Sequence, residues 1–154
     1  MSEADTGADS GRSVAMGAAE TITRPGIDQQ QAVDTAPLVL IVEDEGPIAE
    51  AIALIVRDAG FEPMVAADGL QALEMAGAHP PALVITDLMM PRLDGAELIA
   101  ALRSRAALDG GSAPPTVLVT AAGLRRAEAA GADAVLRKPF DMAALDRLLR
   151  RFLG

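Results

Sequence analysis

Short runs of apolar residues alternate with segments of helical periodicity from residue 37 onward. The run from Leu38 to Val42 is apolar at every position, which is typical of a strand buried on both faces of a parallel sheet. The next segment has its apolar residues at helical spacing, since Ile48, Ile52 and Val56 share one helix face. The same alternation continues to the last residues, so the pattern predicts repeated β–α units.

Five such units are predicted. Strands are expected at residues 38–42, 62–66, 82–86, 115–120 and 133–137. Helices are expected from about Ile48 to Gly60, at 69–78, from Gly95 to near Arg105, at about 124–130, and after Asp141, which can cap the last one. Crossovers between parallel strands are right-handed, so helices should cover both faces of the sheet. The predicted fold class is therefore α/β, a doubly wound five-stranded parallel sheet.

Residues 1–36 have a different composition from the rest. They are rich in small and polar residues, and their six acidic residues outnumber the two basic ones, Arg12 and Arg24. Such a segment buries too little apolar surface to offset the entropy lost on ordering. We therefore predict a disordered acidic N-terminal arm over residues 1–36 and one folded domain over residues 37–154.

Composition excludes several classes of function. The formal net charge of −9 argues against a nucleic-acid partner, because phosphate binding needs a basic face. The absence of cysteine excludes disulfides and thiolate metal sites. No apolar run reaches the roughly 18 residues of a membrane span, and the first residues do not resemble a secretory signal. We expect a cytoplasmic protein without a membrane partner.

Polar residues follow the predicted strands at their carboxyl ends. Glu43 and Asp44 follow the first strand, Asp87 the third, Thr120 ends the fourth, and Lys138, the single lysine, follows the fifth. Ligand sites of such sheets lie beyond the carboxyl ends of the strands, so these groups should meet. Clustered carboxylates favour a hard cation such as Mg²⁺, and a carboxylate beside Mg²⁺ can attack a phosphoryl group.

Four stretches in this order resemble the receiver domains of two-component response regulators. They are residues 39–45 (VLIVEDE), 86–95 (TDLMMPRLDG), 119–121 (VTA) and 131–140 (GADAVLRKPF). The resemblance covers about residues 37 to 154 with near-standard spacing. It implies the flavodoxin-like strand order 2-1-3-4-5, which composition does not show.

The resemblance also implies a phosphorylation site. Asp87 resembles the phospho-acceptor, and Asp44, Asp87 and the backbone carbonyl of Met89 would bind Mg²⁺ or Mn²⁺ directly. Glu43 stands where the family usually has Asp and would act through water. The Met89 side chain can shield the phosphoryl group from water, which predicts slow hydrolysis.

Two further side chains of the resemblance would contact the phosphoryl group. They are the Thr120 hydroxyl and the ammonium of Lys138, which precedes Pro139 and an expected cis bond. The chain departs from the family at Val135, where an aromatic switch residue is usual. The stretch from Thr120 to Lys138 is also about four residues short, so the fourth helix should be shortened. Two arginines on that helix, Arg125 and Arg126, are expected to form a solvated face.

The resulting hypothesis is a single-domain response regulator, because the sequence stops at Gly154 directly after the last helix. Its Asp87 would receive a phosphoryl group from a histidine kinase or a histidine phosphotransfer protein. It would signal to a downstream protein by contact, as a monomer or weak dimer. It would not be an enzyme apart from phosphorylating and dephosphorylating itself.

An alternative is a pseudo-receiver that acts as an interaction module independently of phosphorylation, which Val135 and the short helix favour. An independent phosphatase or nucleotide-binding protein is disfavoured, because no Gly-rich phosphate loop follows the first strand.

Overall fold

Five strands and five helices alternate along residues 35–154, the part of the chain that the computed structural model describes. The strands are β2 (Leu38–Val42), β3 (Glu62–Ala66), β4 (Leu83–Asp87), β5 (Thr116–Thr120) and β6 (Ala134–Arg137). The helices are α3 (Gly46–Asp58), α4 (Gly69–Ala78), α5 (Gly95–Asp109), α6 (Leu124–Ala129) and α7 (Met142–Leu153). The predicted arm over residues 1–36 lies outside the described residues except for its last two positions.

The strands form one parallel sheet in the order β3-β2-β4-β5-β6. Counted along residues 35–154, this order is 2-1-3-4-5, which confirms the topology that the resemblance implied. Strand β2 lies between β3 and β4, with Leu40 opposite Met64 on one side and Val84 on the other. Because parallel strands end at the same edge, the residues after β2, β4, β5 and β6 are brought to one rim.

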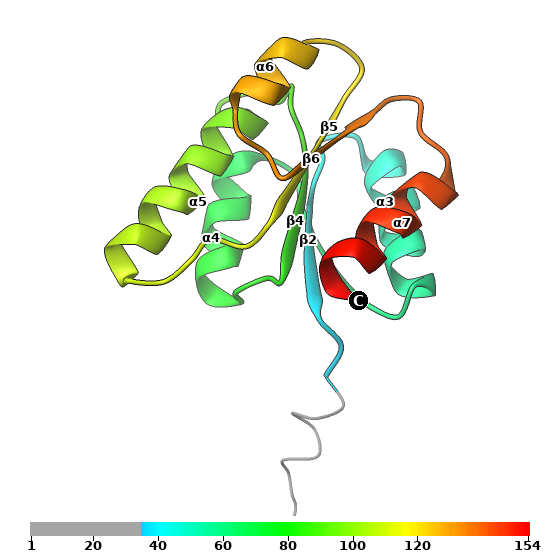
Figure 1. The fold of residues 1–154 in the computed structure, drawn as a ribbon, viewed down its shortest axis with the longest axis horizontal. Helices are drawn as coiled ribbons and strands as arrows, with labels where there is room; N and C mark the ends of the chain where they lie inside the picture. The colour runs from blue at the N-terminus through cyan, green and yellow to red at the C-terminus, as the bar shows by residue number, and fades with distance from the viewer. Residues whose placement is uncertain (1–34) are drawn as a thin grey trace, which may run out of the picture. The chain divides into compact units, whose positions relative to one another are not determined.

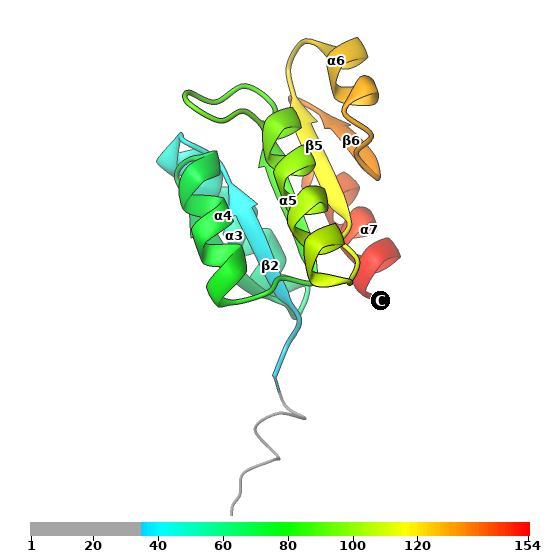
Figure 2. The ribbon, with the colours of Figure 1, turned by 90° about the vertical axis from the view of Figure 1, so that its left-hand side faces the viewer.

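Helices cover both faces of the sheet, as expected for right-handed crossovers. Helices α3 and α7 lie on one face and α4, α5 and α6 on the other (Figure 1). Alternation along β2 supplies both cores: Val39 and Ile41 pack in the α3–α7 cluster, while Leu40 and Val42 pack in the α4–α5 cluster. Figure 2 shows α4 and α5 in front of the sheet and α6 beyond the start of α5, near β5 and β6.

Aspartates cap three of the helices. Asp68, Asp94 and Asp141 precede α4, α5 and α7, and each side chain accepts a hydrogen bond from a backbone N–H in the first turn. Asp94 forms a full capping box, because the Glu97 side chain in turn accepts from the Asp94 backbone N–H at 2.9 Å. The predicted cap at Asp141 is thereby confirmed.

Helix α5 is longer than its pattern predicted. It continues to Asp109 rather than ending near Arg105, because residues 106–108 are two alanines and a leucine, which favour helix. The helix ends where Gly110 adopts a left-handed φ of 79°, a conformation that costs glycine little.

Helix α6 is short, as predicted. It has six residues, of which Ala127 alone is buried. It packs against Leu88, Ile99 and Leu118 through that alanine. Among the described residues, no helix is long and apolar enough to cross a membrane.

Candidate functional site

Three carboxylates meet at the carboxyl edge of the sheet. Glu43, Asp44 and Asp87 each offer an oxygen, and these oxygens all lie within 4.8 Å of one another. Asp44 is exposed, whereas the residue exposures of Glu43 and Asp87 are only 3% and 9%. The sequence predicted this meeting from the strand ends, and the structure confirms it.

The sheet fixes the two buried acids from the backbone. Asp87 is the last residue of β4 and pairs with Val119 of β5. Glu43 directly follows β2, and its backbone N–H donates to the Ala66 carbonyl of β3 at 3.1 Å. Its carboxylate also accepts from the Glu45 backbone N–H at 3.2 Å. The backbones of both acids are therefore held by the sheet, and the loop after β2 adds one hydrogen bond to the Glu43 carboxylate.

Lys138 reaches both buried acids. Its Nζ lies 3.4 Å from Oε1 of Glu43 and 3.6 Å from Oδ2 of Asp87. Its backbone N–H donates to the Thr120 carbonyl at 2.9 Å, and the bond to Pro139 is cis, as expected. A single compact ammonium thus serves two carboxylates, which suits lysine better than a planar guanidinium.

One cation does not balance the three acids. Burial raises the pKa of the Glu43 carboxyl above its ordinary value, and the charge of Asp87 adds to this effect. Burial also raises the pKa of the Asp87 carboxyl, an effect that Lys138 and the Met89 backbone N–H oppose without reversing it. The cluster therefore favours a further cation. Its all-oxygen donor set fits Mg²⁺ and lacks the nitrogen and sulfur ligands that zinc prefers.

Thr120 lies at the same rim but makes local contacts. It ends β5 and is buried, and its hydroxyl donates a hydrogen bond to the Ala122 carbonyl. The same hydroxyl accepts from the Ala122 backbone N–H at 3.2 Å. To bond a phosphoryl group on Asp87, as the resemblance implies, the hydroxyl would have to exchange the Ala122 carbonyl for the new acceptor.

Met89 and Val135 occupy very different surroundings. Met89, two residues after Asp87, is 62% exposed, and its carbonyl stays a predicted metal ligand. Val135 is half-buried and packs against the α5–α6 cluster that contains Leu88 and Leu118. A branched aliphatic side chain therefore fills the place where the family usually has an aromatic ring.

Two arginines bind helix caps beside the site, a feature that the sequence analysis missed. Arg126 forms an ion pair with Asp94, and Arg92 forms one with Asp68. Arg126 is exposed as predicted, and its guanidinium in addition contacts the Asp94 carboxylate. No local pattern indicates this pair, because the position of α6 relative to α5 depends on tertiary packing.

Two hollows flank the acidic cluster. One of about 700 Å³ runs from Glu43 and Asp44 along α3 to Val65. The other, of about 380 Å³, lies beside Lys138 and is lined mainly by apolar residues: Ile48, Ala121, Pro139 and Phe140. The site is therefore open to a partner molecule on two sides.

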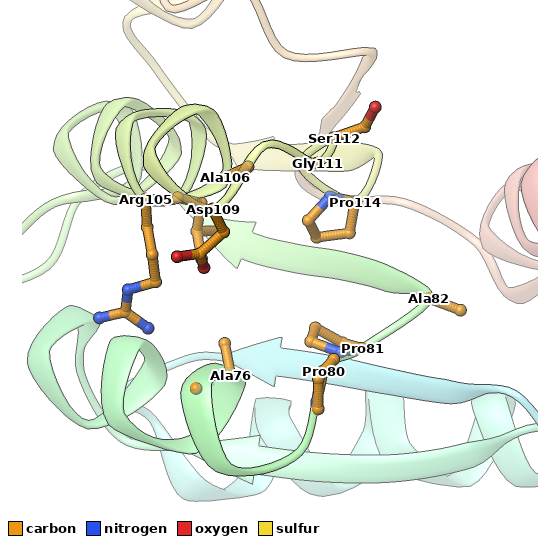
Figure 3. Close-up of a pocket in the computed structure, with 12 residues that line it drawn as sticks. Ala76, Pro80, Pro81, Ala82, Arg105, Ala106, Asp109, Gly111, Ser112 and Pro114 are labelled. Carbon is orange, nitrogen blue, oxygen red and sulfur yellow. The ribbon is translucent and has the colours of Figure 1, made fainter.

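A separate cavity of about 420 Å³ lies at the opposite edge of the sheet, where Ala82 and Pro114 precede β4 and β5 (Figure 3). Arg105 at its margin donates to the Leu73 carbonyl at 2.7 Å, and Asp109 supplies its carboxylate. None of the acids of the cluster lines it, so we assign it no part in the chemistry of the rim.

Comparison with known proteins agrees with this geometry. The family model of the response regulator receiver domain matches residues 39–150. The chain belongs to the response regulator receiver family. Receiver domains bind Mg²⁺ at an acidic pocket, and the cluster of Glu43, Asp44 and Asp87 corresponds to it.

Named relatives are response regulators of greater length. The chain is 39% identical over 129 residues to the transcriptional regulatory protein PdtaR of Mycobacterium tuberculosis, covering 80% of this chain and 59% of PdtaR. It is 35% identical over 121 residues to the response regulator Rre1 of Synechocystis, covering 75% of this chain and 51% of Rre1. The chain thus spans about half to three fifths of the length of these two relatives.

Solved receiver structures share the fold. The structure of the chemotaxis protein CheY4 of Vibrio cholerae matches this one with a TM-score of 0.68 and 30% sequence identity. The match covers 77% of this chain and 100% of the CheY4 chain. The agreement confirms the flavodoxin-like receiver architecture of the described residues.

Proposed function

We propose that this receiver accepts a phosphoryl group on Asp87 and passes the signal on by contact with another protein. The observation that carries the proposal is the Lys138 ammonium, 3.6 Å from a carboxylate oxygen of Asp87 and within reach of Glu43. The donor would be a phosphohistidine of a histidine kinase or a phosphotransfer protein. An Asp87 oxygen would attack phosphorus, and the phosphorus–nitrogen bond would break as the new phosphorus–oxygen bond forms.

Each rim residue would have a distinct role in this step. Lys138 would pair with a phosphoryl oxygen, and the Thr120 hydroxyl would donate to another after leaving the Ala122 carbonyl. Asp44, Asp87 and the Met89 carbonyl would hold Mg²⁺, with Glu43 acting through water. When bound, Mg²⁺ would neutralise negative charge on the phosphoryl oxygens, which is the main requirement of phosphoryl transfer.

The proposal extends to the partners. The apolar hollow beside Lys138 offers a kinase or phosphotransfer protein a surface next to the acceptor. We further propose that the protein acts as a single-domain regulator, as a monomer or weak dimer. We expect no turnover of a separate substrate, only gain and loss of the phosphoryl group on Asp87. A location in the cytoplasm stays a prediction.

A specific observation favours the pseudo-receiver as a second candidate. The Thr120 hydroxyl is bonded to Ala122, and Val135 is too short for an aromatic switch. In that case the same surface would bind its partner whether or not Asp87 is modified.

Phosphorylation with acetyl phosphate and Mg²⁺ separates these candidates. The proposal expects the intact protein to gain one phosphoryl group by mass spectrometry and Asp87→Asn to gain none. Asp109→Asn, which removes an acid at the opposite edge, should behave like the wild type. Failure of the wild type to react with acetyl phosphate and with purified phosphohistidine donors would favour the pseudo-receiver.

A further inference from the structure

The loop that follows the acceptor is held by an ion pair on each side. This acceptor loop, residues 88–94, contains Arg92, which pairs with the α4 cap Asp68. It ends at Asp94, the α5 cap, which pairs with Arg126 of α6. Arg92 has a left-handed φ of 69°, a conformation that non-glycine residues rarely adopt without support from their surroundings. The loop is therefore tied to both α4 and α6.

Asp94 is connected to the acceptor through the backbone contacts of the next residue, Gly95. The next residue, Gly95, lies against the Asp87 carbonyl so closely that a Cβ there would come within 2.4 Å of that oxygen. The Gly95 backbone N–H also donates to the Leu88 carbonyl at 2.9 Å. Because these groups are closely packed, a displacement of Asp94 would also shift the backbone of Asp87.

Helix α6 contacts the same region from the other side. Ala127 of α6 is buried against Leu88, the residue after the acceptor. A Cβ at Gly123 would lie 3.3 Å from the Leu88 side chain, so the segment leading into α6 also touches it. That segment begins at Thr120, whose hydroxyl is bonded to Ala122. These contacts connect the segment after Thr120, helix α6 and Asp94 to Leu88 and to the backbone of Asp87.

We infer that Arg126, acting through Asp94, is a positioning residue for phosphoryl transfer to Asp87. The inference rests on the proposed function and adds a residue that lies outside the acidic rim. Asp94 has its second carboxylate oxygen available for Arg126 because the first accepts from the Glu97 backbone N–H at 2.9 Å. The cap and the ion pair thus use different oxygens, and Arg126 can orient the cap without competing with the helix.

The neighbouring Arg125 provides a matched control. It is exposed on the same helix, and within residues 35–154 it forms no ion pair. Arg125→Gln therefore makes the same change of charge and size as Arg126→Gln without removing the contact to Asp94. Asp94→Asn removes the charge of the cap while retaining an oxygen for the Glu97 N–H.

The test measures the rate of phosphorylation of the full chain by acetyl phosphate in Mg²⁺. The variants compared with it are Arg126→Gln, Asp94→Asn, the double variant that combines these two changes, and the control Arg125→Gln. Arg126→Gln should lower the maximal rate by about two- to fivefold, the range set by an exposed ion pair. The concentration of acetyl phosphate at half-maximal rate should not change. Arg126→Lys should recover part of the loss, and the deficit should shrink in high salt, which screens the pair.

The double variant decides whether Arg126 acts through Asp94. The inference expects its rate to equal that of the slower single variant, because both changes remove the same interaction. Multiplicative effects of the two changes, or equal rates for Arg126→Gln and Arg125→Gln, would overturn it. A different result would contradict the proposed function: a wild type that does not react with any phosphodonor. The inference would then fail with it.

Discussion

The Lys138 ammonium lies between the two buried acids of the rim, 3.4 Å from Glu43 and 3.6 Å from Asp87. A cation in that place can stay beside Asp87 before and after a phosphoryl group is added, because it needs only to rotate between acceptors. The two distances are similar, so the ammonium is shared and not committed to one carboxylate. Because the ammonium is shared, replacing Lys138 with another cationic residue tests whether the site requires lysine.

Lys138→Arg should impair phosphorylation although it keeps the charge. A guanidinium is wide and planar, so it cannot occupy the point shared by Glu43 and Asp87. We expect a loss of about tenfold or more in the rate with acetyl phosphate, the size of one hydrogen bond between charged groups. Arg137→Lys, at the exposed preceding residue, is the control and should react normally. A wild-type rate for Lys138→Arg would show that the lysine has no special role.

Asp87→Asn should stabilise the metal-free protein at neutral pH. Burial raises the folded-state pKa of Asp87 above its ordinary value of 3.8, so the folded state favours the protonated carboxyl. Its contribution to stability is therefore full below pH 3.8 and is lost as pH rises through the folded-state pKa. In EDTA at pH 7 we expect the Tm of Asp87→Asn to rise by roughly 2–6 °C, by differential scanning calorimetry.

The gain in Tm for Asp87→Asn should shrink toward pH 4, where the wild-type carboxyl also becomes neutral. Asp109→Asn, at an exposed residue of α5 outside the acidic cluster, is the control and should leave the Tm close to that of the wild type at both pH values. A lower Tm for Asp87→Asn than for the wild type at pH 7 would contradict the prediction.

Mg²⁺ should stabilise the wild type through Asp44. At a concentration about 100 times its Kd, a ligand that binds only the folded state adds about 2.7 kcal/mol to the free energy of unfolding. We expect this gain to disappear in EDTA and in Asp44→Asn, as measured by urea unfolding. Glu74→Gln, on α4 and outside the cluster, should retain it. An equal Mg²⁺ response in Asp44→Asn and the wild type would remove Asp44 from the ligands.

Met89→Asn should shorten the lifetime of the phosphoryl group. The Met89 side chain is 62% exposed beside the acceptor, where an apolar chain can keep water away and an amide can orient it. We expect faster loss of the phosphoryl group after the donor is removed, measured on phosphate-affinity gels. Leu108→Asn changes an even more exposed apolar residue on α5 and should leave the lifetime unaltered. Identical lifetimes for Met89→Asn and the wild type would count against shielding.

The strands and the rim could be predicted from the sequence because parallel sheets impose strong constraints. A strand buried on both faces must be apolar throughout, as β2 is, and its carboxyl end must face the other strand ends. The sequence alone therefore places Asp44, Asp87 and Lys138 together. The roles given to these residues stay predictions until phosphorylation is measured.

Features that depend on packing between helices could not be read in advance. The periodic pattern predicts too early an end for α5. Residues 106–108 favour helix by their composition, but they add no buried positions at helical spacing, so the pattern stops before the helix does. The contact between Arg126 and Asp94 was missed because it joins residues 32 positions apart on elements whose mutual placement no local pattern encodes.

Helix α6 is too short to be stable by itself, since isolated helices below about 12 residues are marginal in water. It persists because Ala127 is buried, because Arg126 within it pairs with Asp94, and because Arg103 of α5 donates to the Gly131 carbonyl just after it at 2.6 Å. Whether α6 is folded therefore depends on a local folding equilibrium that these few contacts govern. Hydrogen exchange should find α6 among the first helices of the domain to open, and a partner that binds it can select either its ordered or its opened form.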